Sequence, residues 1–148
     1  MEREKFLSSV YMIIREDGKI LLQRRTGTKI YCGFLALPAG HMDKGENSYE
    51  AMIRESREEL GITVTKEDIS DIFVVQRRSA IHGPYYDVYF ELKHYEGEIK
   101  IMEPNKCSEI VWADEKDLPL DMIKFERDAL EMNAKGVKFD CVDVLREE

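Results

Sequence analysis

The sequence has few cysteines and no long apolar run, and both shortages limit what the protein can be. Its three cysteines, Cys32, Cys107 and Cys141, are widely spaced and form no Cys-x-x-Cys pair. This argues against a disulfide framework and against a thiolate zinc site, and it favours a reducing, cytoplasmic setting. The longest early apolar run, residues 10–14, is far shorter than the ~18 residues of a membrane helix. We therefore expect no membrane anchor and no targeting segment.

Basic residues are also in the minority, because 22 Lys and Arg stand against 30 Asp and Glu and give a formal net charge of −8. A sequence-independent grip on nucleic acid or on an anionic membrane depends on clustered basic side chains. We therefore expect neither a long nucleic acid nor a membrane as a partner. An acidic protein that handles phosphate groups is expected to use metal ions.

The chain does contain enough apolar material for a folded core. Its 148 residues are 43% hydrophobic and 35% charged, with seven Tyr and six Phe, which excludes a disordered chain. No internal repeat, low-complexity tract or linker divides it. The length suits a single domain over residues 1–148.

Strand signals recur along the chain. Strands are predicted at residues 8–14, 19–25, 35–37, 69–77, 85–94 and 109–113. The first two are expected to pair antiparallel, because Asp17-Gly18 between them is a strong hairpin signal. Residues 39–46 are expected to form a glycine-bearing loop.

Two helices are predicted between and after these strands. The first begins after Asn47 as N-cap, with Glu50 as its capping-box partner, and stops at Gly61. The second covers about residues 122–135, after Asp121 and before Gly136. This order predicts an α+β sandwich, in which a mixed β-sheet is flanked by helices.

The first predicted helix carries a group of carboxylates on one face. At about 100° per residue, Glu55, Glu58 and Glu59 share one ~100° arc. This arc borders the predicted buried stripe of the helix, which consists of Tyr49, Met52, Ile53, Ser56 and Leu60. On its own, such an acidic face is usually solvated and supported by pairs such as Arg54 with Glu58.

A wider pattern changes that interpretation. Gly40 is followed after five residues by Glu46 and after seven more by Arg54-Glu55, then by Glu58-Glu59 and by Gly61-Ile62. Seven of these eight positions, taken as fixed at roughly 6% usage each, give a chance match on the order of 10⁻⁸ to 10⁻⁹ per starting point. This pattern, over residues 40–62, resembles the Nudix box of the Nudix (MutT-like) hydrolases. Ser56 departs from it, since the family prefers an aliphatic residue there, and its hydroxyl is expected to bond to a carbonyl one turn earlier.

The resemblance implies the Nudix fold and a hydrolase that cleaves a pyrophosphate bond of a small nucleotide with Mg²⁺, or Mn²⁺ in its place. It implies that the Gly40 carbonyl and the carboxylates of Glu55, Glu58 and Glu59 bind metal, which agrees with the oxygen ligands that hard cations prefer. Glu55 and Glu58 would also count as catalytic residues. Arg54 would orient one of these carboxylates through a salt bridge.

Outside the box, the resemblance implies two further site residues. Arg25, at the end of a predicted strand, matches the position where relatives contact a phosphate, although a solvated strand end is an equal alternative. Glu103 lies in a loop where relatives often carry a carboxylate that binds metal or acts as a catalytic base. Glu46 is expected to brace the loop before the helix. Of Tyr85 and Tyr86, strand alternation makes one a core residue, and a base-stacking role stays open.

The resemblance allows more than one class of substrate. The preferred hypothesis is that the substrate is a nucleoside or deoxynucleoside triphosphate, which is cleaved to a monophosphate and pyrophosphate. ADP-ribose or a nucleotide sugar is the alternative, which a short N-terminal segment and the lack of proline in residues 76–79 disfavour. A Nudix-like domain that only senses a nucleotide is a second alternative, disfavoured by the intact ligand positions. The protein is expected to be a monomer or a homodimer.

Overall fold

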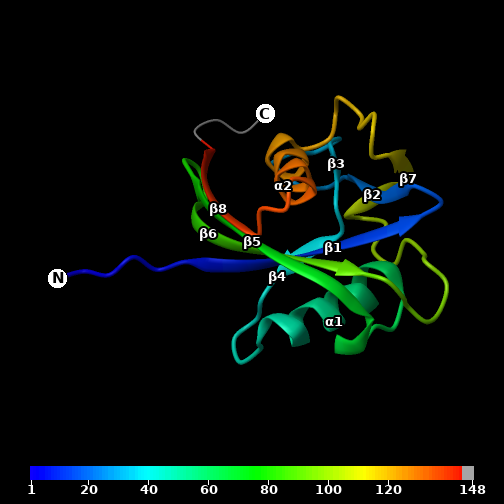
Figure 1. The fold of residues 1–148 in the computed structure, drawn as a ribbon, viewed down its shortest axis with the longest axis horizontal. Coiled ribbons are helices and arrows are strands. Elements are labelled where there is room, and N and C mark those ends of the chain that lie inside the picture. Colours follow the sequence, from blue (N-terminus) through cyan, green and yellow to red (C-terminus); the bar gives the residue numbers. More distant parts are fainter. Residues whose placement is uncertain (145–148) are drawn as a thin grey trace.

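A computed structural model describes residues 1–144, in which a mixed eight-stranded sheet lies between helices α1 and α2 (Figure 1). In chain order the elements are β1 Leu7–Glu16, β2 Lys19–Arg25, β3 Leu35–Ala36, β4 Ala39–His41, α1 Ser48–Leu60, the 3₁₀ turn η1 Lys66–Asp68, β5 Ile69–Ser79, β6 Gly83–Leu92, β7 Cys107–Asp114, α2 Lys124–Ala134 and β8 Phe139–Val144. Within these described residues, no helix has the length and apolar character needed to cross a membrane.

The sheet mixes parallel and antiparallel pairs. Its main path runs β3-β2-β1-β6-β5-β8, with β4 paired to β1 and β7 paired to β2. β1 lies parallel to β6 and β5 lies parallel to β8, whereas the other pairs are antiparallel. Strand β1 is thus hydrogen-bonded on both sides, to β6 along one edge and to β4 and β2 along the other.

Two hydrophobic layers cover the two faces of the sheet, and β1 contributes to both. Tyr11 and Ile13 belong to the layer under α2, whereas Val10, Met12 and Ile14 belong to the layer under α1. This division follows from the period of two in a strand, which sends successive side chains to opposite faces. The predicted sheet flanked by helices is therefore confirmed.

Local signals in the sequence were reliable around the first hairpin and the first helix. β1 and β2 pair antiparallel through the turn at Asp17 and Gly18, which both have positive φ. Asn47 caps α1 by accepting from the Glu50 amide, while the Glu50 side chain accepts from the Asn47 amide. Gly61 ends the helix in the left-handed conformation, at φ 71°. These three predictions are confirmed.

Other boundaries differ from the prediction. Residues 39–41, expected in a loop, form β4, because Gly40 and its neighbours pair with β1. β8 was not predicted, and its pairing partner β5 lies far away in sequence. Helix α2 starts at Lys124, later than expected, because the Asp121 carboxylate accepts from Arg24 at 2.8 Å instead of capping the helix. Residues 121–123 run beside Leu35, whose amide and carbonyl bond to this segment.

Candidate active site

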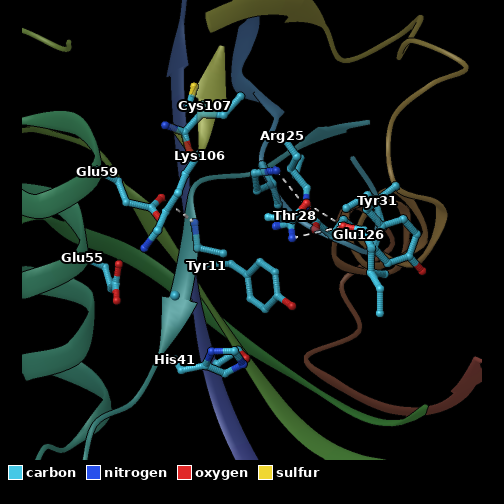
Figure 2. A pocket seen from close by; sticks show the side chains of 18 of the residues that line it. Tyr11, Arg25, Thr28, Tyr31, His41, Glu55, Glu59, Lys106, Cys107 and Glu126 are labelled. Atoms are coloured by element: carbon cyan, nitrogen blue, oxygen red, sulfur yellow. Dashed lines mark hydrogen bonds between the residues drawn. The ribbon is translucent and has the colours of Figure 1, made fainter. Parts of the chain in front are cut away.

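A cavity of about 490 Å³ opens beside β1 and extends from α1 to the start of α2. Figure 2 shows Glu55 and Glu59 on one side of it and Glu126 with Tyr31 on the other, with Tyr11 between them. The Nudix-box glycine, Gly40, also lines it. The cavity thus joins an acidic end on α1 to an aromatic end near α2.

At the acidic end, Glu55 packs directly against Gly40. Glu55 is only 9% exposed although it carries a carboxylate. A Cβ atom added to Gly40 would lie 2.0 Å from Cδ of Glu55 and within 2.5 Å of both its carboxylate oxygens. Glycine is therefore required at position 40 for Glu55 to keep this place.

Glu59 is the most perturbed carboxylate at the acidic end. Burial raises its pKa to about 8, and the nearby charge of Glu55 acts in the same direction. Burial also raises the pKa of Glu55. The Ala39 amide donates to Glu59 at 3.3 Å, which only partly offsets these effects. Two carboxylates lie here with too little positive charge around them, as expected of a site that gains a cation.

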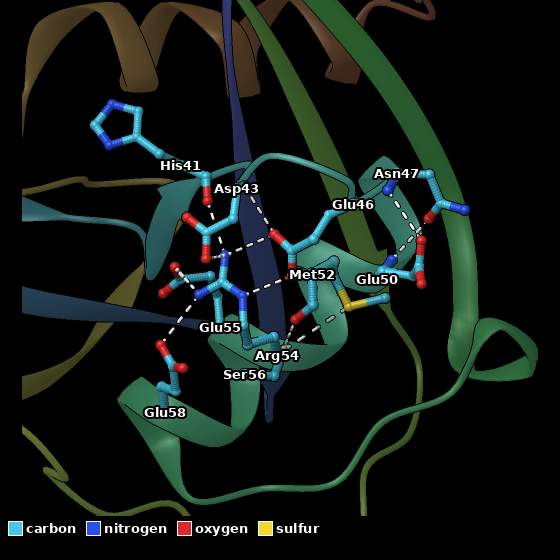
Figure 3. Close-up of polar contacts among 10 residues, drawn as sticks. All are labelled: His41, Asp43, Glu46, Asn47, Glu50, Met52, Arg54, Glu55, Ser56 and Glu58. Atoms are coloured by element: carbon cyan, nitrogen blue, oxygen red, sulfur yellow. Dashed lines mark hydrogen bonds and ion pairs between the residues drawn. The ribbon is translucent and has the colours of Figure 1, made fainter.

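Arg54 ties this end of α1 to the preceding loop (Figure 3). Its Nη1 donates to Glu55 at 2.7 Å and to Glu58 at 3.1 Å. Its Nε and Nη2 donate to Glu46 at 2.7 and 2.9 Å, and Nη2 also donates to the His41 carbonyl at 2.9 Å. Glu58 is turned toward Arg54 and does not line the cavity. Arg54 therefore holds the orientation of three box carboxylates at once, those of Glu46, Glu55 and Glu58.

Glu46 has the bracing position expected from the sequence. Its Oε1 accepts from the Asp43 amide at 2.8 Å, and both its oxygens accept from Arg54. Hydrogen bonding by Arg54 lowers the pKa of Glu46. Glu46 lies outside the cavity lining, so it shapes the loop and does not face the cavity.

The loop before β7 brings Glu103 to the cavity, where it lies with Lys106. Lys106 Nζ is 3.4 Å from the Glu103 carboxylate. The charge of Glu103 contributes to the raised pKa of both Glu55 and Glu59, so the three carboxylates share one electrostatic environment. The structure thus brings together residues that are 44 to 48 positions apart in the sequence.

Arg25 lines the cavity as well, at the end of β2. Its Nη2 donates weakly to the Ile30 carbonyl at 3.4 Å. Its Nε is buried and has no hydrogen-bond partner among residues 1–144. A buried donor of this kind is costly unless a partner is supplied, so Arg25 suits a ligand with acceptor oxygens.

The carboxylates do not form a preassembled cage. Over residues 1–144, no three side chains of His, Cys, Asp or Glu converge closely enough to hold one ion. Glu58 is directed toward Arg54, which donates to it at 3.1 Å (Figure 3), and it does not line the cavity. Glu55 and Glu59 nevertheless reach the cavity together with Gly40 and Glu103.

Sequence reasoning missed the polar residues at the aromatic end. Arg77 and Asp87 form a buried ion pair of 2.6 Å, and the Tyr11 hydroxyl donates to Asp87 at 3.3 Å. The Arg77 guanidinium lies between the rings of Tyr85 and Phe125, at 4.5 and 4.2 Å from their centroids. Strand alternation had required one tyrosine of the pair 85–86 to be buried, and Tyr85 is that residue.

Glu126 is the other residue that the sequence did not single out. It is 3% exposed, lines the cavity and accepts from the Leu37 amide at 2.7 Å. The available signal was its position on α2, where it precedes the buried Ala129 and Leu130 by three and four residues and therefore shares their face.

Comparisons with known proteins agree with this geometry. A family model described as NUDIX domain matches residues 5–132. The chain is 39% identical over 61 residues to a CTP pyrophosphohydrolase of Escherichia coli. This match covers 41% of this chain and 45% of that protein. It is 32% identical over 97 residues to an ADP-ribose pyrophosphatase of Methanocaldococcus jannaschii, covering 66% of this chain and 56% of that protein. The matches thus span about half the length of these curated relatives.

A solved structure resembles the chain over more of its length. The crystal structure of a MutT NUDIX hydrolase from Burkholderia pseudomallei superposes with a TM-score of 0.74 at 28% identity. The superposition covers 86% of this chain and 98% of that one.

Proposed function

Since this chain belongs to the Nudix family, we propose that it hydrolyses a pyrophosphate bond of a small nucleotide. The preferred substrate is a nucleoside or deoxynucleoside triphosphate, which water would cleave to a monophosphate and pyrophosphate. We further propose that residues 1–148 act as one catalytic domain.

One observation carries this proposal: the buried Glu55 and the half-buried Glu59 line the same cavity as Glu103 and Arg25. Closely spaced buried carboxylates repel one another and are poorly solvated, which the raised pKa of Glu59 reflects. A polyphosphate would add more negative charge to the same space. Binding it there requires a cation that carboxylates and phosphate oxygens share.

The available donors fit a hard divalent cation. Gly40, Glu55, Glu58 and Glu59 would hold Mg²⁺ through carbonyl and carboxylate oxygens, with Mn²⁺ as a substitute. The bound cation would neutralise the polyphosphate and lower the pKa of water. Arg54 orients Glu55 through its hydrogen bond, whereas Glu58, which also accepts from Arg54 and lies outside the cavity lining, would have to turn toward the cation.

The residues across the cavity would act on the substrate itself. We assign to Glu103 the removal of a proton from the attacking water, because it is a carboxylate that lines the same cavity as Glu55 and Glu59 and interacts electrostatically with both. We assign to Arg25 the binding of a phosphate group, because its guanidinium lines the cavity with an unpaired buried donor.

The relatives support two substrate classes. The CTP pyrophosphohydrolase favours a nucleoside triphosphate, and the ADP-ribose pyrophosphatase favours a nucleoside diphosphate linked to a sugar. The experiment is therefore a panel of CTP, dCTP, ATP, GTP and ADP-ribose, incubated with Mg²⁺, Mn²⁺ or EDTA, with the products separated by chromatography. We expect metal-dependent release of pyrophosphate from a triphosphate. Metal-dependent AMP formation from ADP-ribose alone would shift the assignment to that class.

Two variants sharpen the panel. Glu59→Gln is expected to lower kcat by ~10² or more, because charge stabilisation at the metal is lost. Glu131→Gln, an exposed position on α2, is the matched control and is expected to leave kcat unchanged. Nucleotide binding without turnover by the unmodified protein, with either metal, would refute catalysis and favour a sensing domain.

A further inference from the structure

The carboxyl group of Glu126 lies at the opposite end of the cavity from the carboxylates of α1 (Figure 2). It projects from the first turn of α2 and is 3% exposed. Its Oε1 accepts from the Leu37 amide at 2.7 Å, which leaves Oε2 for a second partner. Glu126 is absent from the ion pairs among residues 1–144.

The charge state of Glu126 follows from its surroundings. The titratable groups that face it are Arg25 on β2, Arg77 on β5, Asp87 on β6, Tyr11 on β1 and Tyr89 on β6. Burial dominates over the two arginines and raises the pKa of Glu126 to about 8. At pH 7 the group is therefore a neutral carboxylic acid, with Oε1 accepting from Leu37 and the proton on Oε2.

The walls beside Glu126 are aromatic and aliphatic. The rings of Tyr31 and Phe125 lie 6.1 Å apart, and both residues line the cavity together with Ile30 and Ile123. Flat apolar surfaces of this kind suit a planar heterocycle, because bases stack on aromatic rings without regard to their sequence identity. Apolar and aromatic walls with a small number of polar groups, here including Glu126, Arg25 and Thr28, are the usual form of a site for a planar polar ring.

We propose that Glu126 is a specificity-determining residue that binds the nucleobase of the substrate in its neutral form, with Oε2–H donating to an acceptor on the base edge. The inference rests on the proposed function, because it assigns the acidic end of the same cavity to the polyphosphate. A neutral carboxyl offers one donor beside one acceptor, which matches the acceptor beside a donor on a base edge. The ionised group offers acceptors only and loses this match. Substrates that carry a base are therefore distinguished from inorganic polyphosphates.

Three proteins test the proposal: the unmodified chain, Glu126→Gln and Glu126→Ala. Gln presents a donor beside an acceptor at every pH and so reproduces the neutral carboxyl. Calorimetry in Mg²⁺ would measure Kd for the α,β-methylene analogue of CTP and for inorganic tripolyphosphate. Binding is read without turnover, so a failure of the proposed hydrolysis would not obscure the result.

The expected results differ between the two ligands. Glu126→Ala should weaken binding of the nucleotide analogue about tenfold, as one lost hydrogen bond predicts, and leave tripolyphosphate unchanged. Between pH 7 and 9 the unmodified chain should lose nucleotide affinity relative to tripolyphosphate, whereas Glu126→Gln should keep a constant ratio. Glu131→Ala, exposed on the same helix, should match the unmodified chain.

Two outcomes would overturn the proposal. Equal weakening of both ligands in Glu126→Ala would show a structural role alone. The same alkaline loss of nucleotide affinity in Glu126→Gln would show that another group titrates. If Glu126→Ala does not fold, the pH dependence of the ratio in Glu126→Gln decides the question by itself.

Discussion

Replacing Glu126 by Gln should stabilise the protein at neutral and alkaline pH, because the unmodified carboxyl must stay protonated in the fold. Its pKa is about 8 when folded against a usual value of 4.5. Between these values the native state binds more protons than the unfolded state, so stability falls as pH rises. Each pH unit in this range lowers the free energy of unfolding by about 1.4 kcal/mol. At pH 7, which is 2.5 units above 4.5, the loss is therefore about 3 kcal/mol.

Glu126→Gln removes this pH-dependent cost, and its amide oxygen can still accept from the Leu37 amide. The free energy of unfolding would be measured with guanidinium chloride in EDTA at pH 5, 6, 7 and 8. The two proteins should be similar at pH 5 and diverge steadily toward pH 8, with unchanged slopes against denaturant. Glu131→Gln, exposed on the same helix, should follow the unmodified chain at every pH. Parallel curves for Glu126→Gln and the unmodified chain from pH 5 to 8 would refute a buried neutral carboxyl.

Three further substitutions test other parts of the structure. Ser56→Ala should change the free energy of unfolding by about 1 kcal/mol or less and kcat by only a few fold, because the fully buried hydroxyl bonds only within its own helix. A large fall in kcat at unchanged stability would contradict this. Gly40→Ala should lower kcat by ~10², because the added Cβ displaces the Glu55 carboxylate. This is measured by steady-state kinetics at saturating Mg²⁺, and normal turnover would contradict the prediction. Asp87→Asn should cost about 3–5 kcal/mol in denaturant unfolding, because Arg77 stays buried without its counter-charge, and a loss under 1 kcal/mol would mean that water reaches the pair.

Predictability from the sequence depended on whether a feature is local. Helix α1 was predicted to the residue because its capping box and its glycine stop act within one turn. Ser56 was placed in the buried stripe with its hydroxyl bonded one turn back, and it donates to the Met52 carbonyl at 2.8 Å. In contrast, β4 and β8 exist through pairing with distant strands, and the Ala-Gly-His sequence of β4 alone carries little strand signal.

The residues of the site likewise divide into those that local spacing predicts and those that only the folded chain brings together. The box carboxylates have a fixed spacing on one helix, so the sequence predicts their grouping, although it does not predict that Arg54 turns Glu58 out of the cavity. The aromatic end is assembled from β1, β5, β6 and α2, and its ion pair joins residues ten positions apart on facing strands. No local spacing rule relates such residues. The roles of Glu103 as a base and of Arg25 in phosphate binding stay predictions.

Strand β1 forms the floor of the cavity and is paired along both edges. Amide hydrogens in such a doubly paired, doubly covered strand exchange only when much of the domain opens. The exchange of the Val10, Met12 and Ile13 amides should therefore follow global unfolding, whereas the loop at residues 26–34 should exchange earlier. With that exchange pattern, the wall of the site that carries Tyr31 would open in local fluctuations while β1 stays intact. Substrates would enter and leave on a much faster timescale than the one on which the fold itself is lost.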